Sequence, residues 1–495
     1  MTADLPLRRN CMPKLYKVEI MNTKTAVLST RWAKIPVDTV KLIQITAVSL
    51  ICWYFFKPAA LSNDAWKLFV IFVSTVVAII AKPLPMGAIA LTSVGLLTLT
   101  KTLTLQTALQ GFAYDQIWLI VLACFLARGF IKTGLGRRIA YGFLSLFGGT
   151  PLGMGYGLII SSCCMSPLIP STTARTAGIV LPVLRSIITV IQGNQATAAF
   201  LTLVVMHASV ITSAMFVTAN AGNPIILKFA QNMGIEISWI TWAEAAILPG
   251  IVSLLLLPFM LKFFIPCTVA DAQAVKTHAH EELATMGKIR WQEKALLGVF
   301  ALLLALWSFG SFFGVHATEA ALYGVGLLLL LKVLSWKDIL DEELAWDTFM
   351  WMGILIMMAS EMQKLGVISW FTDSVVTFLP AACWQWQLLL LALVYFYSHY
   401  LFASTVAHVS SMYGPFLALA VSTGAPPVAA MLLLGFLSSL FGAITHYASG
   451  PAPILYSQQH IDVKTWWKVG FITSIAYLVI WGGLGTLWWS FLGLI

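Results

Sequence analysis

The chain is dominated by long apolar runs with short polar turns between them. Such runs occupy about 42–56, 65–81, 84–100, 196–219, 240–265, 295–313, 318–334 and 469–491. Apolar runs of this kind cross a bilayer as helices, and they are too continuous for a β-barrel, whose strands alternate. Only 10% of the residues are charged, against about a quarter in soluble domains. The sequence therefore predicts an all-α polytopic membrane protein.

The charge distribution indicates how the chain is oriented. The net charge is +9, and basic side chains crowd the segment before the first apolar run, namely Arg8, Arg9, Lys14, Lys17, Lys24, Arg31, Lys34 and Lys41. Basic residues stay on the cytoplasmic side of membrane proteins. We therefore predict that residues 1–41 form a basic cytoplasmic tail and that the protein lies in the inner (cytoplasmic) membrane. The tail lacks the apolar core and cleavage site of a signal peptide, and orientation explains the positive charge without a nucleic-acid partner.

Two short polar stretches interrupt the apolar sequence in the same way. Ser171-Thr172-Thr173 lies within 170–175, and Ser404-Thr405-Val406 lies within 403–408. Each is followed by a basic side chain four residues after its serine, Arg175 in the first stretch and His408 in the second. A proline comes eleven residues after each serine, at Pro182 and Pro415. Paired polar breaks in apolar helices are typical of membrane carriers, which bind their cargo near the middle of the bilayer.

Further landmarks recur in the two halves in the same order and at near-identical spacing. They are Asp115, Lys132, Gly134 and Asn223-Pro224-Ile225 in the first half, and Asp347, Lys364, Gly366 and Ala452-Pro453-Ile454 in the second. We predict an internal repeat, 113–266 and 345–495, with a polar linker loop at 267–294. Repeats separated by an odd number of crossings insert with opposite topology, as in many secondary transporters. The predicted architecture is about 11 transmembrane helices plus two re-entrant hairpins, with tips at 170–175 and 403–408.

The two tips have the chemistry of an anion site. A helix broken inside a membrane must line a cavity or lie within protein, and its free N-terminal N–H groups and positive dipole end then face that cavity. The hydroxyls of Ser171, Thr172, Thr173, Ser404 and Thr405 add further hydrogen-bond donors. Two facing tips suit a small dicarboxylate, which has acceptors at both ends. The alternative for either motif by itself is that its hydroxyls only cap the helix.

Arg175 and His408 are the most informative single residues. A charged side chain at the centre of a membrane costs roughly 2.5–3.5 kcal/mol, and a cation in the first turn of a helix also opposes the helix dipole. An anion nearby offsets both costs. The alternatives are a snorkelling or structurally paired arginine and a neutral, hydrogen-bonded histidine.

The remaining polar groups have simpler explanations. His207, His399 and His446 are single histidines on apolar helices, where a satisfied structural role is expected, and Glu361 and Lys364 lie three residues apart, where they can pair with each other. The segment 278–282 (His-Ala-His-Glu-Glu) is expected to be a solvated loop rather than a metal site. The seven cysteines lack CxxC spacing and are expected to be apolar filler. No cofactor or metal is predicted, and the sequence has no HExxH, nucleotide-binding or GxSxG motif that would indicate an enzyme.

These motifs resemble the divalent anion:sodium symporter family, whose members have paired Ser-Asn-Thr motifs at two hairpin tips. The similarity covers about residues 42–495 and is greatest to the branch of 2-oxoglutarate/malate translocators and citrate or tartrate:succinate antiporters. It is carried by the stretches 133–140, 171–175, 398–404, 407–408 and 447–451.

The resemblance implies a scaffold domain, which would include 42–112 and 295–344, a transport domain, elevator-like alternating access and a homodimer. In sodium-coupled members the asparagine of each tip helps to bind sodium, whereas this chain has Thr172 and Thr405 there. In the exchanger branch, the positions of Arg175 and His408 are thought to place positive charge where sodium would lie. The resemblance therefore implies sodium-independent exchange.

The sequence thus predicts a carrier that exchanges dicarboxylates of the 2-oxoglutarate, malate or succinate kind. Its candidate substrate-binding residues are Ser171, Thr172, Thr173, Arg175, Asn223, Ser404, Thr405, Val406, His408, Ser449, Gly450 and Pro451. The expected partners are dicarboxylate anions, the lipid bilayer and a second copy of the chain. The alternatives are a sodium- or proton-coupled di- or tricarboxylate symporter, a carrier of a sulfate-type oxyanion, and an anion channel.

Overall fold

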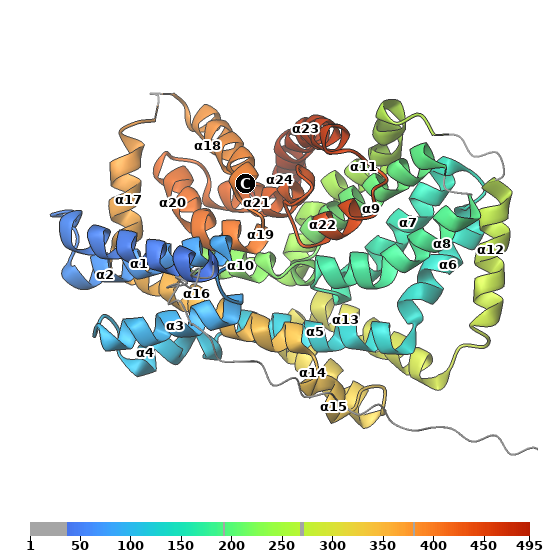
Figure 1. Ribbon diagram of the computed structural model, residues 1–495, viewed down its shortest axis with the longest axis horizontal. Coiled ribbons are helices and arrows are strands. Elements are labelled where there is room, and N and C mark those ends of the chain that lie inside the picture. Colours follow the sequence, from blue (N-terminus) through green and yellow to red (C-terminus); the bar gives the residue numbers. More distant parts are fainter. Residues whose placement is uncertain (1–36, 192–193, 268–271, 380–381) are drawn as a thin grey trace, which may run out of the picture.

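The computed structural model describes residues 37–191, 194–267, 272–379 and 382–495, and within these ranges the chain folds into helices without strands (Figure 1). Residues 1–36 of the basic tail expected at 1–41 lie outside the described residues. The first helix begins at Val37, so the last five residues of the expected tail, 37–41, belong to this helix. The helices before the first repeat are α1 (Val37–Phe55), α2 (Asn63–Ala81), α3 (Met86–Leu99), α4 (Leu105–Leu109) and the 3₁₀ turn η1 (Gln110–Ala113).

The first repeat contains a hairpin followed by a broken helix. Its elements are α5 (Asp115–Thr133), α6 (Leu135–Phe147), α7 (Pro151–Met165), η2 (Ser166–Leu168), η3 (Ala174–Val180), α8 (Leu181–Val190), α9 (Gln195–Met215), η4 (Val217–Ala219) and α10 (Gly222–Asn232). The hairpin arms are α7 and η3–α8, and the tip lies between them, where the sequence predicted it. The long helix α11 (Trp239–Phe264) follows.

The linker at 267–294 contains a helix and is not the solvated loop that we expected. Helix α12 (Ala272–Thr285) packs against α6 and α8 of the first hairpin. His278 is half-buried there, with its Nε2 2.5 Å from Oγ of Ser186. Buried Val275 and Ala279 complete the apolar face that holds α12 on the hairpin. The chain continues through α13 (Trp291–Phe309), η5 (Gly310–Phe313), α14 (Ala317–Leu330) and α15 (Trp336–Leu340).

The second repeat has the same order of elements as the first. It comprises α16 (Glu343–Lys364), α17 (Val367–Val376), α18 (Trp384–Ser398), η6 (His399–Leu401), α19 (Thr405–His408), η7 (Val409–Tyr413), α20 (Gly414–Ser422), α21 (Pro427–Leu440), η8 (Phe441–Ala443) and α22 (Pro451–Tyr456). It ends in α23 (Val463–Val479), η9 (Ile480–Leu484) and α24 (Gly485–Phe491). The backbone matches in detail, because Gly134 and Gly366, at φ 78° and 76°, separate α5 from α6 and α16 from α17.

Both hairpins contain a π-helical turn behind the tip. In the first hairpin this turn is η3, which ends two residues before Pro182, and in the second it is η7, which ends two residues before Pro415. A proline inside a helix lacks the N–H of one hydrogen bond, and its ring presses on the carbonyl four residues earlier. Pro182 and Pro415 are the second residues of α8 and α20, so the π turn and the proline occupy the same place in both hairpins.

Six helices among the described residues are long and apolar enough to cross a membrane: α2, α5, α9, α11, α13 and the continuous run Val463–Phe491. A seventh results if α16 and α17, which are bent by 69° where they join, form one span. The chain is therefore a multi-pass membrane protein. In the apolar stretch of α9 every residue is buried, whereas only 39% and 33% of the corresponding stretches of α11 and α13 are buried. Helix α9 is therefore internal, and α11 and α13 face outward.

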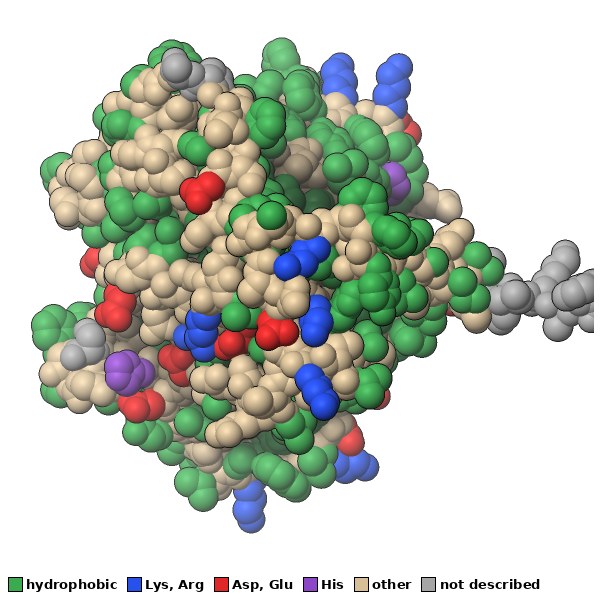
Figure 2. All heavy atoms as spheres, turned by 90° about the vertical axis from the view of Figure 1, so that its left-hand side faces the viewer, with side chains coloured by type: hydrophobic (Ala, Val, Ile, Leu, Met, Phe, Trp, Pro, Cys, Tyr) green, Lys and Arg blue, Asp and Glu red, His purple; other side chains and the backbone are tan. Residues whose placement is uncertain are grey.

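Two groups of helices can be distinguished, one around α16 and one around α9. Helix α16 packs on α2, α3 and α5, while α9 packs on α7, α11 and α21. The face formed by the left-hand side of Figure 1, with α1 to α4 and α17, has apolar side chains over much of its area (Figure 2). Its exposed apolar side chains include Ile43, Val48, Tyr54 and Phe55 of α1.

Candidate functional site

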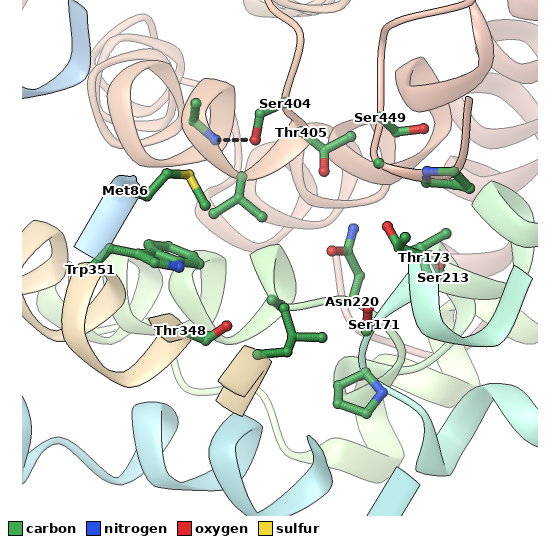
Figure 3. A pocket seen from close by; sticks show the side chains of 18 of the residues that line it. Met86, Ser171, Thr173, Ser213, Asn220, Thr348, Trp351, Ser404, Thr405 and Ser449 are labelled. Carbon is green, nitrogen blue, oxygen red and sulfur yellow. Dashed lines mark hydrogen bonds between the residues drawn. The ribbon is translucent and has the colours of Figure 1, made fainter. Parts of the chain in front are cut away.

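The two hairpin tips lie at one cavity of about 370 Å³ (Figure 3). Figure 3 shows Ser404 and Thr405 on one side, Ser171 and Thr173 on another, and Trp351 of α16 on a third. Nine of the candidate site residues line this cavity: Ser171, Thr172, Thr173, Ser404, Thr405, Val406, Ser449, Gly450 and Pro451. The sequence repeat thus predicted which segments meet, although they are more than 230 positions apart.

The tip hydroxyls are arranged to donate hydrogen bonds into the cavity. Ser171 Oγ accepts from the N–H of Ala174 at 3.1 Å, and Ser404 Oγ accepts from the N–H of Ala407 at 3.3 Å. Each serine thus caps its helix through an oxygen lone pair, which leaves its hydroxyl hydrogen free for a ligand. Among the described residues, the hydroxyls of Thr173 and Thr405 have no hydrogen-bond partner in the protein, and both face the cavity. Capping and ligand binding are therefore compatible.

The tip of each repeat packs on the helix break of the other repeat. A Cβ atom on Gly450 would collide with Oγ1 of Thr173, and a Cβ atom on Gly222 would lie 3.6 Å from Cγ2 of Val409. Gly450 begins the second half of the broken helix in repeat two, and Gly222 does so in repeat one. The cavity wall is therefore built jointly by the two repeats.

Arg175 lies directly behind the first tip and does not line the cavity. Its side chain is fully buried, and its guanidinium donates to the carbonyls of Ile169 (2.9 Å), Ser209 (3.1 Å) and Ala219 (3.3 Å) and to Ser213 Oγ (2.8 Å). All four acceptors are neutral, and no carboxylate pairs with Arg175 in the described part of the chain. The structure thus buries a positive charge beside the cavity without a protein counter-charge.

His408 occupies the corresponding place behind the second tip and also lies outside the cavity wall. It is fully buried, with its Nε2 3.0 Å from Ser398 Oγ and its Nδ1 3.0 Å from Nδ1 of His399. His399 in turn approaches the carbonyl of Ala448 through Nε2, at 2.7 Å. The rings of Phe402 and Phe441 stack on His408, with centroids 4.5 and 4.6 Å away.

The sequence misplaced one member of the cavity wall. We expected Asn223, but it is fully buried and its Nδ2 donates to the carbonyls of Ser213 and Phe216. The cavity is lined instead by Asn220 of the same break, whose Nδ2 donates to Ser439 Oγ at 3.0 Å. Asn220 has an extended backbone (φ −146°) whereas Asn223 lies inside α10. Such a break has no side-chain periodicity from which this difference could be read.

Two charged residues at the cavity were also missed. Lys82, in left-handed conformation at the end of α2, and Asp347 of α16 both contribute to its wall. Oδ1 of Asp347 accepts a hydrogen bond from the N–H of Gly87 at the start of α3. In the sequence, Lys82 precedes Pro83 and Pro85, a pattern that indicates only the end of a helix.

Broken helices around a polar cavity inside a multi-pass membrane protein define the class as a membrane transporter. A family model of the sodium:sulfate symporter transmembrane region matches residues 37–495, and the chain belongs to this family. The match confirms the resemblance drawn from the tip motifs. Family and relatives are transporters and not enzymes.

Similar proteins occur in plants and bacteria. The chain is 43% identical to dicarboxylate transporter 1 of Arabidopsis thaliana chloroplasts, over 92% of this chain and 83% of that protein. It is 44% identical to YflS of Bacillus subtilis, provisionally named a malate transporter, over 92% and 97% of the two chains. The inner membrane protein YbhI of Escherichia coli is 33% identical over 91% and 97%.

Solved structures of more distant transporters share the fold. MtrF of Neisseria gonorrhoeae matches with a TM-score of 0.53 and 12% identity, over 90% of this chain and 97% of MtrF. YdaH of Alcanivorax borkumensis matches with a TM-score of 0.50 and 15% identity, over 87% and 99%.

Proposed function

We propose that this transporter exchanges dicarboxylates of the 2-oxoglutarate, malate and succinate class across the inner membrane, without sodium. The names of the plant and Bacillus relatives support a dicarboxylate as the cargo. Two donor-rich tips on different sides of one cavity support it as well, because a dicarboxylate has acceptors at both ends.

The observation that carries the proposal is the environment of Arg175. A buried guanidinium with four neutral acceptors leaves a full positive charge beside the cavity. The bound sodium of a symporter would supply the same charge from solution, so the arginine makes sodium unnecessary. His408 supplies positive charge behind the second tip.

This charge favours exchange over one-way transport. A charge in the middle of a membrane costs roughly 2.5–3.5 kcal/mol, so an empty, positively charged site moves across the low-dielectric region slowly. With a dianion bound, the site approaches neutrality and the cost falls. The carrier therefore moves readily only when loaded, in both directions.

The proposed roles of the site residues follow from their places. Ser171, Thr172, Thr173, Ser404 and Thr405 donate hydrogen bonds to the two carboxylates. Asn220 takes the place in the wall that we had given to Asn223. Val406 and the break Ser449-Gly450-Pro451 close the remaining sides of the cavity.

We further infer an elevator-type movement in a homodimer. The helices around α9, with both hairpins, would form the transport domain, and those around α16 would form the scaffold. The two repeats would have inverted topology, and the N-terminus would be cytoplasmic. The exposed apolar side chains of α1 are suited to lipid or to a second copy of the chain.

Uptake of labelled 2-oxoglutarate into proteoliposomes tests the proposal. Vesicles are loaded with malate or left empty, each with sodium or with choline outside. Exchange predicts uptake that needs internal malate and ignores sodium. Uptake that needs sodium and ignores internal malate would identify a symporter, and labelled sulfate in the same assay tests an oxyanion cargo.

A further inference from the structure

We propose that His399 is a positioning residue that keeps one proton on His408 and thereby completes the cation behind the second tip. This inference rests on the proposed function, since the cation matters for transport only if the cargo is an anion. His399 itself does not line the cavity.

The first argument is the correspondence between the repeats. Asn223-Pro224 corresponds to Ala452-Pro453, so Ala219 corresponds to Ala448. Arg175 reaches the carbonyl of Ala219 directly. His408 is the shorter side chain, and it reaches the carbonyl of Ala448 through His399. The two histidines together therefore span the distance that the single arginine spans in the first repeat.

The second argument is a count of hydrogens in the chain of contacts. Ser398 Oγ donates to the carbonyl of Tyr395 at 2.8 Å, and a hydroxyl has only one hydrogen to donate. Nε2 of His408, 3.0 Å from the same oxygen, must then be the donor of that contact. Nε2 of His399 must also carry a hydrogen, because its partner is a carbonyl oxygen.

The contact between the rings needs one more hydrogen. This hydrogen lies between the two Nδ1 atoms, and the proposal places it on His408, with Nδ1 of His399 as the acceptor. All four contacts are made when the two rings carry three N–H groups, which is one more than two neutral imidazoles carry. The full set of hydrogen bonds therefore corresponds to a dyad with a single positive charge, which we assign to His408.

The surroundings contain little else that titrates. The rings facing His408 belong to His399, Tyr395, Phe402 and Phe441, and only the first two of these can ionise. Tyr395 is held by Ser438 through its hydroxyl, at 2.7 Å. Neither histidine forms an ion pair with a carboxylate within the described ranges. A pH dependence of the site is thus expected to come from the dyad.

The test is the pH profile of exchange by the full-length carrier in proteoliposomes. Malate/2-oxoglutarate exchange is measured with equal pH on both sides, from about pH 5.5 to about pH 8.5, so that no proton gradient contributes. The wild type is expected to lose activity in a single one-proton step as the pH rises. His399→Phe keeps the stacking but removes the acceptor of the His408 hydrogen bond, so its midpoint should move down by about one to two pH units.

Two further variants separate positioning from packing. The amide oxygen of His399→Asn can still accept from His408, so its midpoint should stay within about half a pH unit of the wild type. His207→Phe is the matched control, because His207 is equally buried and bonds the hydroxyl of Tyr477, but it has no contact with His408. Its midpoint should equal that of the wild type. A midpoint unchanged in His399→Phe, or shifted equally in His207→Phe, would overturn the proposal.

A spectroscopic measurement keeps the two proposals apart. In full-length protein with ¹⁵N-labelled histidine in nanodiscs, His408 should show two protonated ring nitrogens and His399 only Nε2–H, at a pH below the transport midpoint. A neutral His408 at that pH would refute the dyad even if exchange is intact. If uptake never needs internal malate but the doubly protonated His408 is seen, the dyad stands and the exchange function fails.

Discussion

Thr173 at the tip of the first hairpin lies where a side chain on Gly450, in the second repeat, would have to begin. Gly450 has φ −54° and ψ −42°, which any residue can adopt. The glycine is therefore needed for the space it leaves to Thr173 and not for its backbone freedom.

This contact predicts the effect of Gly450→Ala. The added methyl group must displace the first tip, so exchange should fall about tenfold or more. In the double variant with Thr173→Ala the collision is gone, and its activity should equal that of Thr173→Ala alone. Gly178→Ala, where the added atom meets open space, is the control. Additive losses in the double variant would contradict the contact.

Arg175→Ala should change the ion requirement of transport. Removal of the guanidinium takes one donor from each of three carbonyl oxygens and one hydroxyl, and oxygen clusters of this kind attract small cations. We expect exchange in choline medium to fall by at least about 100-fold. Sodium should restore part of it, as measured by uptake at constant ionic strength. Arg185→Ala, which removes an arginine bonded to Gln458 at the surface, should show no sodium effect.

Thr405→Val and Thr173→Val should each weaken binding of a dicarboxylate. Each variant removes one hydroxyl that has no partner among the described protein groups and keeps the shape of the side chain. The KM for 2-oxoglutarate should rise by about five- to tenfold, with little change in the maximal rate. Thr197→Val, on α9 and outside the cavity wall, serves as the control. Unchanged KM values in both tip variants would remove these hydroxyls from the site.

Asp338 gives a pH prediction outside the membrane-spanning helices. Burial alone would raise its pKa, but hydrogen bonds from Lys132 and Ser335 outweigh it and lower the pKa to about 2. The stabilisation from this carboxylate is therefore complete above its unfolded value of 3.8 and is lost as the pH falls toward about 2.

Asp338→Asn should consequently lower the unfolding temperature by the same amount at every pH between about 5 and 8. The loss corresponds to roughly 1 kcal/mol, mainly from the helix cap of Ser335. The loss of stability is measured by thermal unfolding of the purified protein. The pH profile of exchange should be the same in Asp338→Asn as in the wild type. A loss of stability that varies within this pH range would assign the titration to another group.

The sequence predicted the parts of this site that depend on spacing. Matching intervals around Ser171 and Ser404 placed both tips, Arg175 and His408, because repeated segments adopt the same local structure. Asn220 could not be distinguished from Asn223, since a helix break has no periodicity that tells which side chain faces a cavity.

The role of His399 could not be predicted either. It lies five residues before Ser404 on an apolar helix, and only the tertiary contact with His408 gives it a second partner. Helix α12 was missed for a related reason, because its mixed charges hide a buried stripe of only two small residues, Val275 and Ala279.

The contact of Thr173 with Gly450 also limits which residues these two positions can hold. Thr173 in the first half leaves no room for a side chain at position 450 in the second half. A larger residue at position 450 would therefore require a smaller one at position 173. Positions 173 and 450 are therefore expected to change together, although each half contains a complete hairpin of its own.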